Sequence, residues 1–148
     1  MNSQPLTVND LRDRVVLVRW WTAPACPFCE ASSAALNTWH HRYADDGLTV
    51  VGIYHHKLSA PLSEGAVAKY AAKLGFEFPI AIDREWRTLN EWWLNAEPRS
   101  WTSVSFLIDR RGRIRYVHPG GSYEEGQADY DQLVNHIETL LAEYKTTP

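Results

Sequence analysis

The sequence predicts an α/β fold in which helices cover both faces of a mixed β-sheet. Short, β-branched runs alternate with segments whose apolar residues recur at helical spacing, a pattern typical of parallel strands joined by helices. Two strand-like runs near the end are separated by only a short polar segment, which indicates an antiparallel hairpin in the same sheet. At 148 residues the chain has the length of one compact domain, so we expect a single domain over residues 1–148.

The first part of the chain predicts a β-α-β unit. Residues 15–18 (VVLV) form an unbroken apolar run, as expected of a strand covered on both faces. Residues 31–43 are rich in helix formers. Three of their apolar side chains form one buried stripe: Leu36, Trp39 and Tyr43. Gly47 ends this helix, and residues 48–54 (LTVVGIY) form a second buried strand that a crossover would pair in parallel with the first.

The middle of the chain predicts an inserted helix and strand. Pro61 can open the helix and Gly75 can close it. Four apolar residues keep the helical spacing between them: Val67, Tyr70, Ala71 and Leu74. Residues 79–82 (PIAI) form a short strand, and we expect residues 85–94 to form a further short helix. The apolar face of that helix would hold three side chains: Trp86, Leu89 and Trp93.

The last part predicts a hairpin and a C-terminal helix. Residues 103–108 and 113–117 form the two strands, and the Asp and Gly of residues 109–112 (DRRG) suit a tight turn. The final helix has an apolar face of six residues: Tyr130, Leu133, Ile137, Leu140, Leu141 and Tyr144. The element order β-α-β-α-β-α-β-β-α therefore predicts a three-layer sandwich.

The composition excludes several classes of function. A hydrophobic content of 45% and a charged content of 22% are those of a folded domain. The net charge of −3 lacks the basic excess that binds nucleic acid or an acidic membrane surface, so neither is an expected partner. No apolar run approaches the roughly 18 residues that span a bilayer. Residues 1–10 lack the pattern of a secretory signal, so we expect a cytoplasmic protein unless the sequence has lost a leading segment.

The two cysteines, Cys26 and Cys29, are the most informative residues of the chain. A disulfide within Cys-x-x-Cys closes a very short loop and stabilises the fold little, so we interpret the pair as reactive. A free thiol has a pKa of about 8.5, and the amide groups at a helix start would stabilise the thiolate of Cys26. We therefore expect Cys26 to be the nucleophile and Cys29 the resolving thiol. A zinc ribbon needs a second cysteine pair, so no metal or other cofactor is expected.

Several segments resemble a known family. The run V-V-L-V-x-W-W before Cys-Pro-Phe-Cys (residues 26–29), with L-T-V-V-G-I after the helix, is similar to the thioredoxin superfamily. Residues 73–83 (KLGFEFPIAID) and 106–114 (FLIDRRGRI) resemble its TlpA-like and redoxin branch. The resemblance implies a thioredoxin-like fold with a central helix–strand insertion, and a thiol–disulfide oxidoreductase that cycles the pair between dithiol and disulfide. The implied partners are a protein or small-molecule disulfide or thiol substrate and a recycling reductant.

Departures from the family pattern concern the surroundings of the cysteines. The proline that usually precedes the strand facing them, in a cis peptide, is replaced by Ser103. A non-proline cis bond costs about 2.5–4 kcal/mol, so we expect a trans peptide with the Thr102 and Ser103 hydroxyls near the sulfurs. The acid of many thioredoxins falls at Arg19 and the glutamate of TlpA-like relatives at Ser32, which leaves the proton acceptor unassigned. We expect Arg19 to pair with a surface carboxylate; pointing inward, it would favour a thiolate.

The residues beside the pair are expected to contact substrate. Pro27 suits the first turn of a helix, and Phe28 would add an apolar rim. Trp21 and Trp101 should lie close to the first cysteine, where they either shape a substrate groove or belong to the core. The segment before that cysteine is one residue longer than usual and ends in Ala25 in place of an aromatic residue, which leaves the sulfur more open.

Other interpretations stay open. The redoxin branch includes peroxiredoxin-like members, so a thiol peroxidase is the second hypothesis, although Pro-x-x-x-Thr-x-x-Cys is missing before Cys26. A metal- or protein-binding module without turnover is the third. Residues 55–56 (HH) could join the cysteines in a copper or zinc site, but we favour a solvated loop. We expect residues 40–41 (HH) to face water and residues 118–121 (HPGG) to form a turn.

Overall fold

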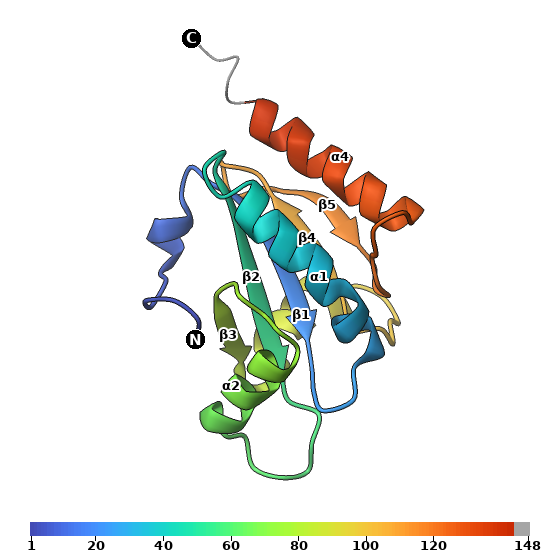
Figure 1. Cartoon of the computed structure of the whole chain (residues 1–148). Coiled ribbons are helices and arrows are strands. Elements are labelled where there is room, and N and C mark those ends of the chain that lie inside the picture. Colours follow the sequence, from blue (N-terminus) through green and yellow to red (C-terminus); the bar gives the residue numbers. More distant parts are fainter. Residues whose placement is uncertain (144–148) are drawn as a thin grey trace.

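A five-stranded mixed sheet organises the computed structural model, which describes residues 1–143 (Figure 1). Its strands are β1 (Val15–Trp21), β2 (Leu48–His55), β3 (Ile80–Asp83), β4 (Ser105–Ile108) and β5 (Ile114–His118). They lie in the order β3-β2-β1-β4-β5. Strands β2 and β3 continue the sheet from β1 in parallel, whereas β4 runs antiparallel to both β1 and β5. The expected mixed sheet with a terminal hairpin is confirmed.

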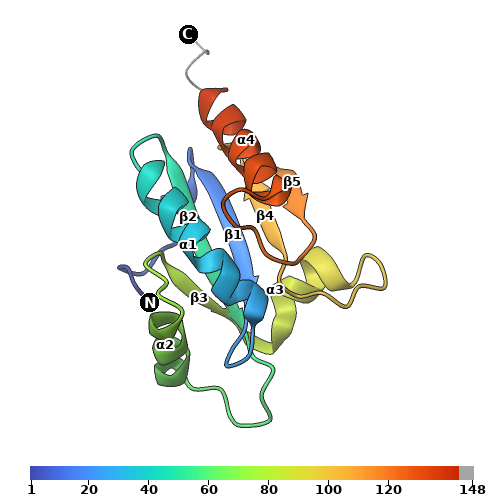
Figure 2. The same cartoon turned by 45° about the vertical axis from the view of Figure 1, so that its right-hand side comes forward.

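Helices cover both faces of this sheet (Figures 1 and 2). The longer helices are α1 (Pro27–Arg42), α2 (Glu64–Lys73) and α4 (Ala128–Ala142), and the short α3 is Arg87–Leu89. Buried side chains of α1, α2 and α4 pack in one core cluster with one face of the sheet, while the α3 region packs in a second cluster on the other face. The molecule is therefore the three-layer sandwich expected from the sequence.

Strand β1 lies at the centre of the sheet and is buried along its whole length. Because side chains alternate along a strand, its odd and even residues belong to different layers. Val15, Leu17 and Trp21 face the core under α1, and Val16 and Val18 face the core under α3. The unbroken apolar run in the sequence is the consequence of these two covered faces.

Helix α1 begins earlier than its apolar stripe indicated, because Pro27 occupies its first turn. Helix α2 begins later than expected. Its N-cap is Ser63, whose hydroxyl accepts a hydrogen bond from the Ala66 amide at 3.4 Å, so Pro61 lies outside the helix. Gly75 follows this helix with a φ of +69°, a left-handed conformation that suits glycine.

The single helix expected over residues 85–94 is wrong. The segment consists of a 3₁₀ turn (Arg84–Trp86), the short α3 and a π-helical turn (Asn90–Leu94). The carboxylate of Asp83 accepts hydrogen bonds from the amides of Thr88 and Leu89 at 2.9 and 2.7 Å, which satisfies the start of α3 from the end of β3. Of the three side chains expected on the apolar face of this segment, Leu89 and Trp93 are buried and Trp86 is half-buried.

The C-terminal elements follow the sequence pattern closely. In the hairpin turn, Asp109 accepts hydrogen bonds from the amides of Arg111 and Arg113, and Gly112 has a φ of +77°. Four of the expected apolar residues of α4 are buried: Leu133, Ile137, Leu140 and Leu141. Tyr130 packs partly buried against the same core, and Tyr144 lies outside the described residues. Within residues 1–143, no helix combines the length and apolarity that crossing a membrane requires.

Candidate active site

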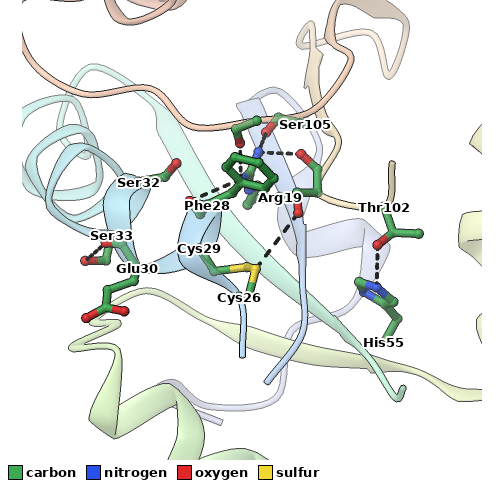
Figure 3. Close-up of a disulfide and its surroundings, with 12 residues drawn as sticks. Arg19, Cys26, Phe28, Cys29, Glu30, Ser32, Ser33, His55, Thr102 and Ser105 are labelled. Atoms are coloured by element: carbon green, nitrogen blue, oxygen red, sulfur yellow. Dashed lines mark hydrogen bonds between the residues drawn. A yellow bond between two sulfur atoms is a disulfide. The ribbon is translucent and has the colours of Figure 1, made fainter. Parts of the chain in front are cut away.

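The cysteine pair lies where α1 begins, directly after the loop that follows β1 (Figure 3). Cys26 is the N-cap of the helix, and its carbonyl accepts hydrogen bonds from the amides of Cys29 and Glu30 at 3.0 and 3.1 Å. The two cysteines form a disulfide with their Cα atoms 5.2 Å apart. Cys29 is only 1% exposed, whereas Cys26 is partly exposed. The expected position of the motif at a helix N-terminus is confirmed, and only one of the two sulfurs is open to a partner.

The segment before β4 faces the disulfide. The Ser103 hydroxyl lies 3.9 Å from the Cys26 sulfur, and the Thr102–Ser103 peptide is trans, as expected from the absence of proline. The Thr102 hydroxyl instead forms a 2.9 Å hydrogen bond with Nε2 of His55. Of the two hydroxyls expected near the sulfurs, the structure therefore places only that of Ser103 in contact with one. The strand itself begins two residues later than expected, at Ser105.

We expect the Ser103→Ala substitution to raise the pKa of the Cys26 thiol in the reduced protein by about one unit. A hydrogen bond to a charged group contributes about 1.5–3 kcal/mol, and the long contact here favours the lower end of that range. The measurement is the pH dependence of Cys26 alkylation. Ser33→Ala is the matched control, because that hydroxyl donates to the Glu30 carbonyl. Equal pKa values in both variants would contradict a role for the Ser103 hydroxyl.

Arg19 does not pair with a surface carboxylate, so that expectation is wrong. The side chain is 1% exposed and points into the core on the α1 side of the sheet. Its guanidinium donates to the carbonyls of Ser103 at 2.6 Å, Gly121 at 2.7 Å and Phe28 at 3.5 Å. It also lies 5.0 Å from the centroid of the Tyr123 ring. The period-two alternation of β1 was the signal for this orientation, since residue 19 shares a face with the buried residues 15, 17 and 21.

Position 32, where TlpA-like relatives have a glutamate, holds a neutral serine that is buried. The Ser32 side chain is fully buried, and its hydroxyl accepts a hydrogen bond from the Tyr123 amide at 3.2 Å. Tyr123 in turn places its hydroxyl 3.2 Å from that of Ser105. Burial raises the pKa of Tyr123. The layer beneath the disulfide is therefore neutral apart from the guanidinium.

The two tryptophans expected near Cys26 have different environments. Trp21 is completely buried and makes edge contacts with the rings of Tyr54 and Phe76 at 4.9 and 5.1 Å. Trp101 is 56% exposed and contacts the Phe28 ring edge-on at 5.4 Å. Trp21 therefore belongs to the core, and Trp101 is available at the surface beside the first turn of α1. Pro27 and Ala25 are exposed on either side of Cys26, in agreement with the open surroundings expected for this sulfur.

His55 lies at the end of β2 and is fully buried, so the expectation of a solvated loop is wrong for it. Burial lowers its pKa to about 4, with a further contribution from the Lys57 charge. His56 is half-buried and contacts the Tyr54 hydroxyl and the Ala60 carbonyl. The partner of the buried imidazole is Thr102, next to the residue that faces Cys26. This histidine therefore supports the active-site segment from behind.

We expect the oxidised protein to lose stability as the pH falls from about 6.5 towards 4. His55 is neutral in the folded protein and has an ordinary pKa of 6.5 when unfolded, so the unfolded chain binds the extra proton first. Above pH 6.5 His55 is neutral in both states and the free energy of unfolding is unaffected by it. Below that pH the free energy of unfolding falls, and the loss due to His55 reaches about 3 kcal/mol near pH 4. Urea unfolding across this range measures it. His55→Gln should flatten the dependence of stability on pH, leaving the smaller slopes of His40 and His118, whose pKa values are also lowered by burial. An unchanged slope would contradict this assignment.

Three further histidines, His40, His41 and His118, lie in different surroundings. His41 is exposed, as expected, and is hydrogen-bonded to Glu77, whereas His40 is half-buried, so the expectation that it faces water is wrong. His118 is the last residue of β5, is 2% exposed and contacts the Asp129 carboxylate at 3.2 Å. The glycines after it, residues 120–121, both have positive φ values and make the expected turn. This turn delivers the carbonyl of residue 121 to the buried guanidinium.

A cysteine pair at the start of the helix that follows β1, with the segment before the antiparallel strand β4 facing it, is the arrangement of a thioredoxin-like domain with a Cys-x-x-Cys disulfide. The AhpC/TSA family model matches residues 1–117, and the chain belongs to that family. The expected membership of the redoxin branch of the thioredoxin superfamily is thereby confirmed. So is the expected fold class.

Comparisons with individual proteins agree with this assignment. Protein DipZ of Mycobacterium bovis is 34% identical over 134 residues, which are 90% of this chain but 18% of DipZ. The thiol-disulfide oxidoreductase ResA of Geobacillus kaustophilus is 27% identical over 135 residues, 90% of this chain and 67% of ResA. The crystal structure of a thiol-disulfide isomerase from Corynebacterium glutamicum superposes with a TM-score of 0.74 at 26% identity, covering 95% of this chain and 89% of that one.

Proposed function

We propose that the chain exchanges disulfides with protein thiols through Cys26 as the attacking sulfur and Cys29 as the resolving one. The observation that carries this assignment is the unequal exposure of the pair, since Cys29 is 1% exposed and Cys26 is partly open. A substrate can therefore reach the Cys26 sulfur, while Cys29 is held beneath it. The helix start at Cys26 also places its sulfur at the positive end of the helix dipole, which stabilises a thiolate.

The exchange conserves atoms and electrons. The Cys26 thiolate attacks one sulfur of a substrate disulfide, and the other substrate sulfur leaves as a thiolate that takes a proton from water. Cys29, after losing its proton, attacks the Cys26 sulfur and releases the second substrate sulfur. The two cysteines thereby lose two electrons to the substrate, and a recycling reductant must return them. The same steps in reverse oxidise a substrate dithiol.

The surface around Cys26 favours a polypeptide substrate. Trp101 is 56% exposed and lies against Phe28, and the neighbouring Pro24, Ala25 and Pro27 are also exposed. An apolar rim of this kind offers contact area to an extended segment beside its cysteine. A small disulfide such as oxidised glutathione would use little of this rim. The cytoplasmic location expected from the sequence stays a prediction.

The experiment that tests the proposal compares two substrates for the reduced protein. We expect rapid reduction of the insulin disulfides and slow consumption of hydrogen peroxide. The thiol peroxidase hypothesis predicts the opposite order. The sequence argues against it, because the Pro-x-x-x-Thr-x-x-Cys arrangement is missing, and the structure adds that Thr22, four residues before Cys26, is buried. Faster reaction with peroxide than with insulin would overturn the proposal.

A further inference from the structure

Arg19 is a positive charge enclosed in the layer directly beneath the disulfide. Its side chain is 1% exposed, and its hydrogen bonds go to neutral oxygens: three backbone carbonyls and the Ser105 hydroxyl at 3.3 Å. Within residues 1–143, no carboxylate forms an ion pair with this guanidinium. Burial lowers the pKa of Arg19, yet a guanidinium stays charged at neutral pH. Burying a charge without a counter-ion costs free energy of folding. The buried guanidinium therefore points to a negative group that forms nearby during the reaction and pairs with it.

The contacts of Arg19 connect it to both cysteines. One terminal nitrogen holds the Ser103 carbonyl, and the hydroxyl of the same residue faces the Cys26 sulfur at 3.9 Å. The other reaches the Phe28 carbonyl at 3.5 Å, which belongs to the peptide group immediately before Cys29. Figure 3 shows Arg19 above the disulfide in that view, beside Phe28 of the first turn of α1 and next to Ser105. The planar, forked guanidinium thus bridges the two segments that enclose the sulfurs.

We propose that Arg19 is a positioning residue that ties the Ser103 segment to the first turn of α1 and stabilises the Cys29 thiolate during exchange. This inference rests on the proposed function, in which Cys29 must lose its proton before it attacks the Cys26 sulfur. The proton passes to solvent, the Cys26–substrate bond breaks as the Cys26–Cys29 bond forms, and the substrate sulfur leaves as a thiolate. Positions 19 and 32 hold no carboxylate to accept this proton, and the fixed positive charge instead favours its loss to solvent by stabilising the thiolate.

The other titratable groups near Arg19 are neutral at neutral pH or exposed to water. Burial raises the pKa of Tyr123 and lowers those of His118 and His55, so all three are neutral. Glu30 is on the exposed side of α1, in water. Desolvation by itself raises the pKa of a thiol as buried as Cys29, and the guanidinium that contacts the peptide group before Cys29 opposes that rise. We therefore expect the Cys29 pKa to lie at or below its ordinary value of about 8.5.

The test measures the Cys29 pKa by the pH dependence of alkylation in a Cys26→Ser background, where Cys29 is the single thiol. Arg19→Met, which removes the charge, should raise this pKa by about one unit or more, and Arg19→Lys should keep it near the parent value. Ser105→Ala is the matched control, because it removes a contact of Arg19 and retains the charge. Equal Cys29 pKa values in the Arg, Lys and Met proteins would overturn the proposal.

A second readout uses the full cysteine pair. Stabilising a thiolate favours the reduced protein only where that thiol is ionised. At a pH above the Cys29 pKa of both proteins, Arg19→Met should therefore lower the equilibrium constant for oxidation of glutathione by roughly tenfold, which is a shift of about 30 mV to a more negative potential. Arg19→Lys should shift it little. If circular dichroism shows that Arg19→Met does not fold, the Cys29 pKa is measured in the Cys26→Ser protein that retains Arg19. A value above about 8.5 in that protein would overturn the proposal. Mixed disulfides trapped at Cys29 in place of Cys26 would instead refute the proposed function, whatever the Arg19 variants show.

Discussion

Replacing Cys26 by serine should reduce disulfide exchange to the uncatalysed rate. The thiolate is the nucleophile in this chemistry, and a serine hydroxyl neither ionises near neutral pH nor forms a disulfide. Cys29 cannot take over the attack, because its side chain is 1% exposed beneath Cys26. The loss should therefore be at least about a thousandfold in the insulin reduction assay, as expected when a nucleophile is removed.

The matched control for Cys26→Ser is Cys29→Ser. Both variants lack the disulfide, so both lose the same short cross-link, and they differ only in which sulfur remains. Loss of the cross-link itself should cost both variants equally little, because a loop this short constrains the unfolded chain little, whereas Cys29→Ser also places a hydroxyl among core residues and should be the less stable of the two in urea. Full activity of Cys26→Ser in a cellular assay would favour the hypothesis of a binding module without turnover.

Replacing Cys29 by serine should convert turnover into trapping. Cys26 remains at the helix N-terminus and can still attack a substrate disulfide, but the second step has no resolving sulfur. The variant should therefore accumulate a mixed disulfide with one substrate chain per molecule. Non-reducing electrophoresis and peptide mass spectrometry of the adduct measure this, and the linked peptide should contain Cys26.

The reverse pattern would refute the roles assigned to the two sulfurs. If Cys26→Ser trapped substrate at Cys29 and Cys29→Ser did not trap it, the buried sulfur would be the attacking one. That outcome would require the first turn of α1 to open, since Cys29 lies among the core residues of this layer. Adding dithiothreitol should release the trapped substrate and distinguishes a disulfide from any other adduct.

Most of the sheet and helices could be predicted because their signals are local. The alternation of strand runs with helical stripes, and the Asp and Gly of the hairpin turn, depend on residues close together in the sequence. The segment after β3 escaped this reasoning. Its start is set by the Asp83 carboxylate, which accepts the Thr88 and Leu89 amides and also a hydrogen bond from the Trp20 indole at 3.3 Å. Helical spacing of apolar residues does not report such a contact.

The candidate site divides in the same way. The resemblance to the thioredoxin superfamily implied the place of Ser103 opposite the cysteines, while the spacing of Cys26 and Cys29 and their position after a strand could be derived from motifs. The burial of Arg19 and His55 could not, because long polar side chains are ordinarily assigned to the surface. Their partners come from far along the chain: Arg19 is bonded to carbonyls 84 and 102 residues away, and His55 to a hydroxyl 47 residues away.

From the residues alone followed the mixed sheet and the reactive pair at a helix start, since each depends on neighbours in the chain. The place of Ser103 opposite that pair was implied by the resemblance to the thioredoxin superfamily. Folding in three dimensions was needed to show that the Arg19 guanidinium is buried beside the first turn of α1 with no carboxylate partner among residues 1–143, and that Trp21 is in the core while Trp101 is at the surface. The reason is physical: whether a polar group can be buried depends on the donors and acceptors that meet it. Those groups come from distant segments that are brought together only when the sheet has assembled.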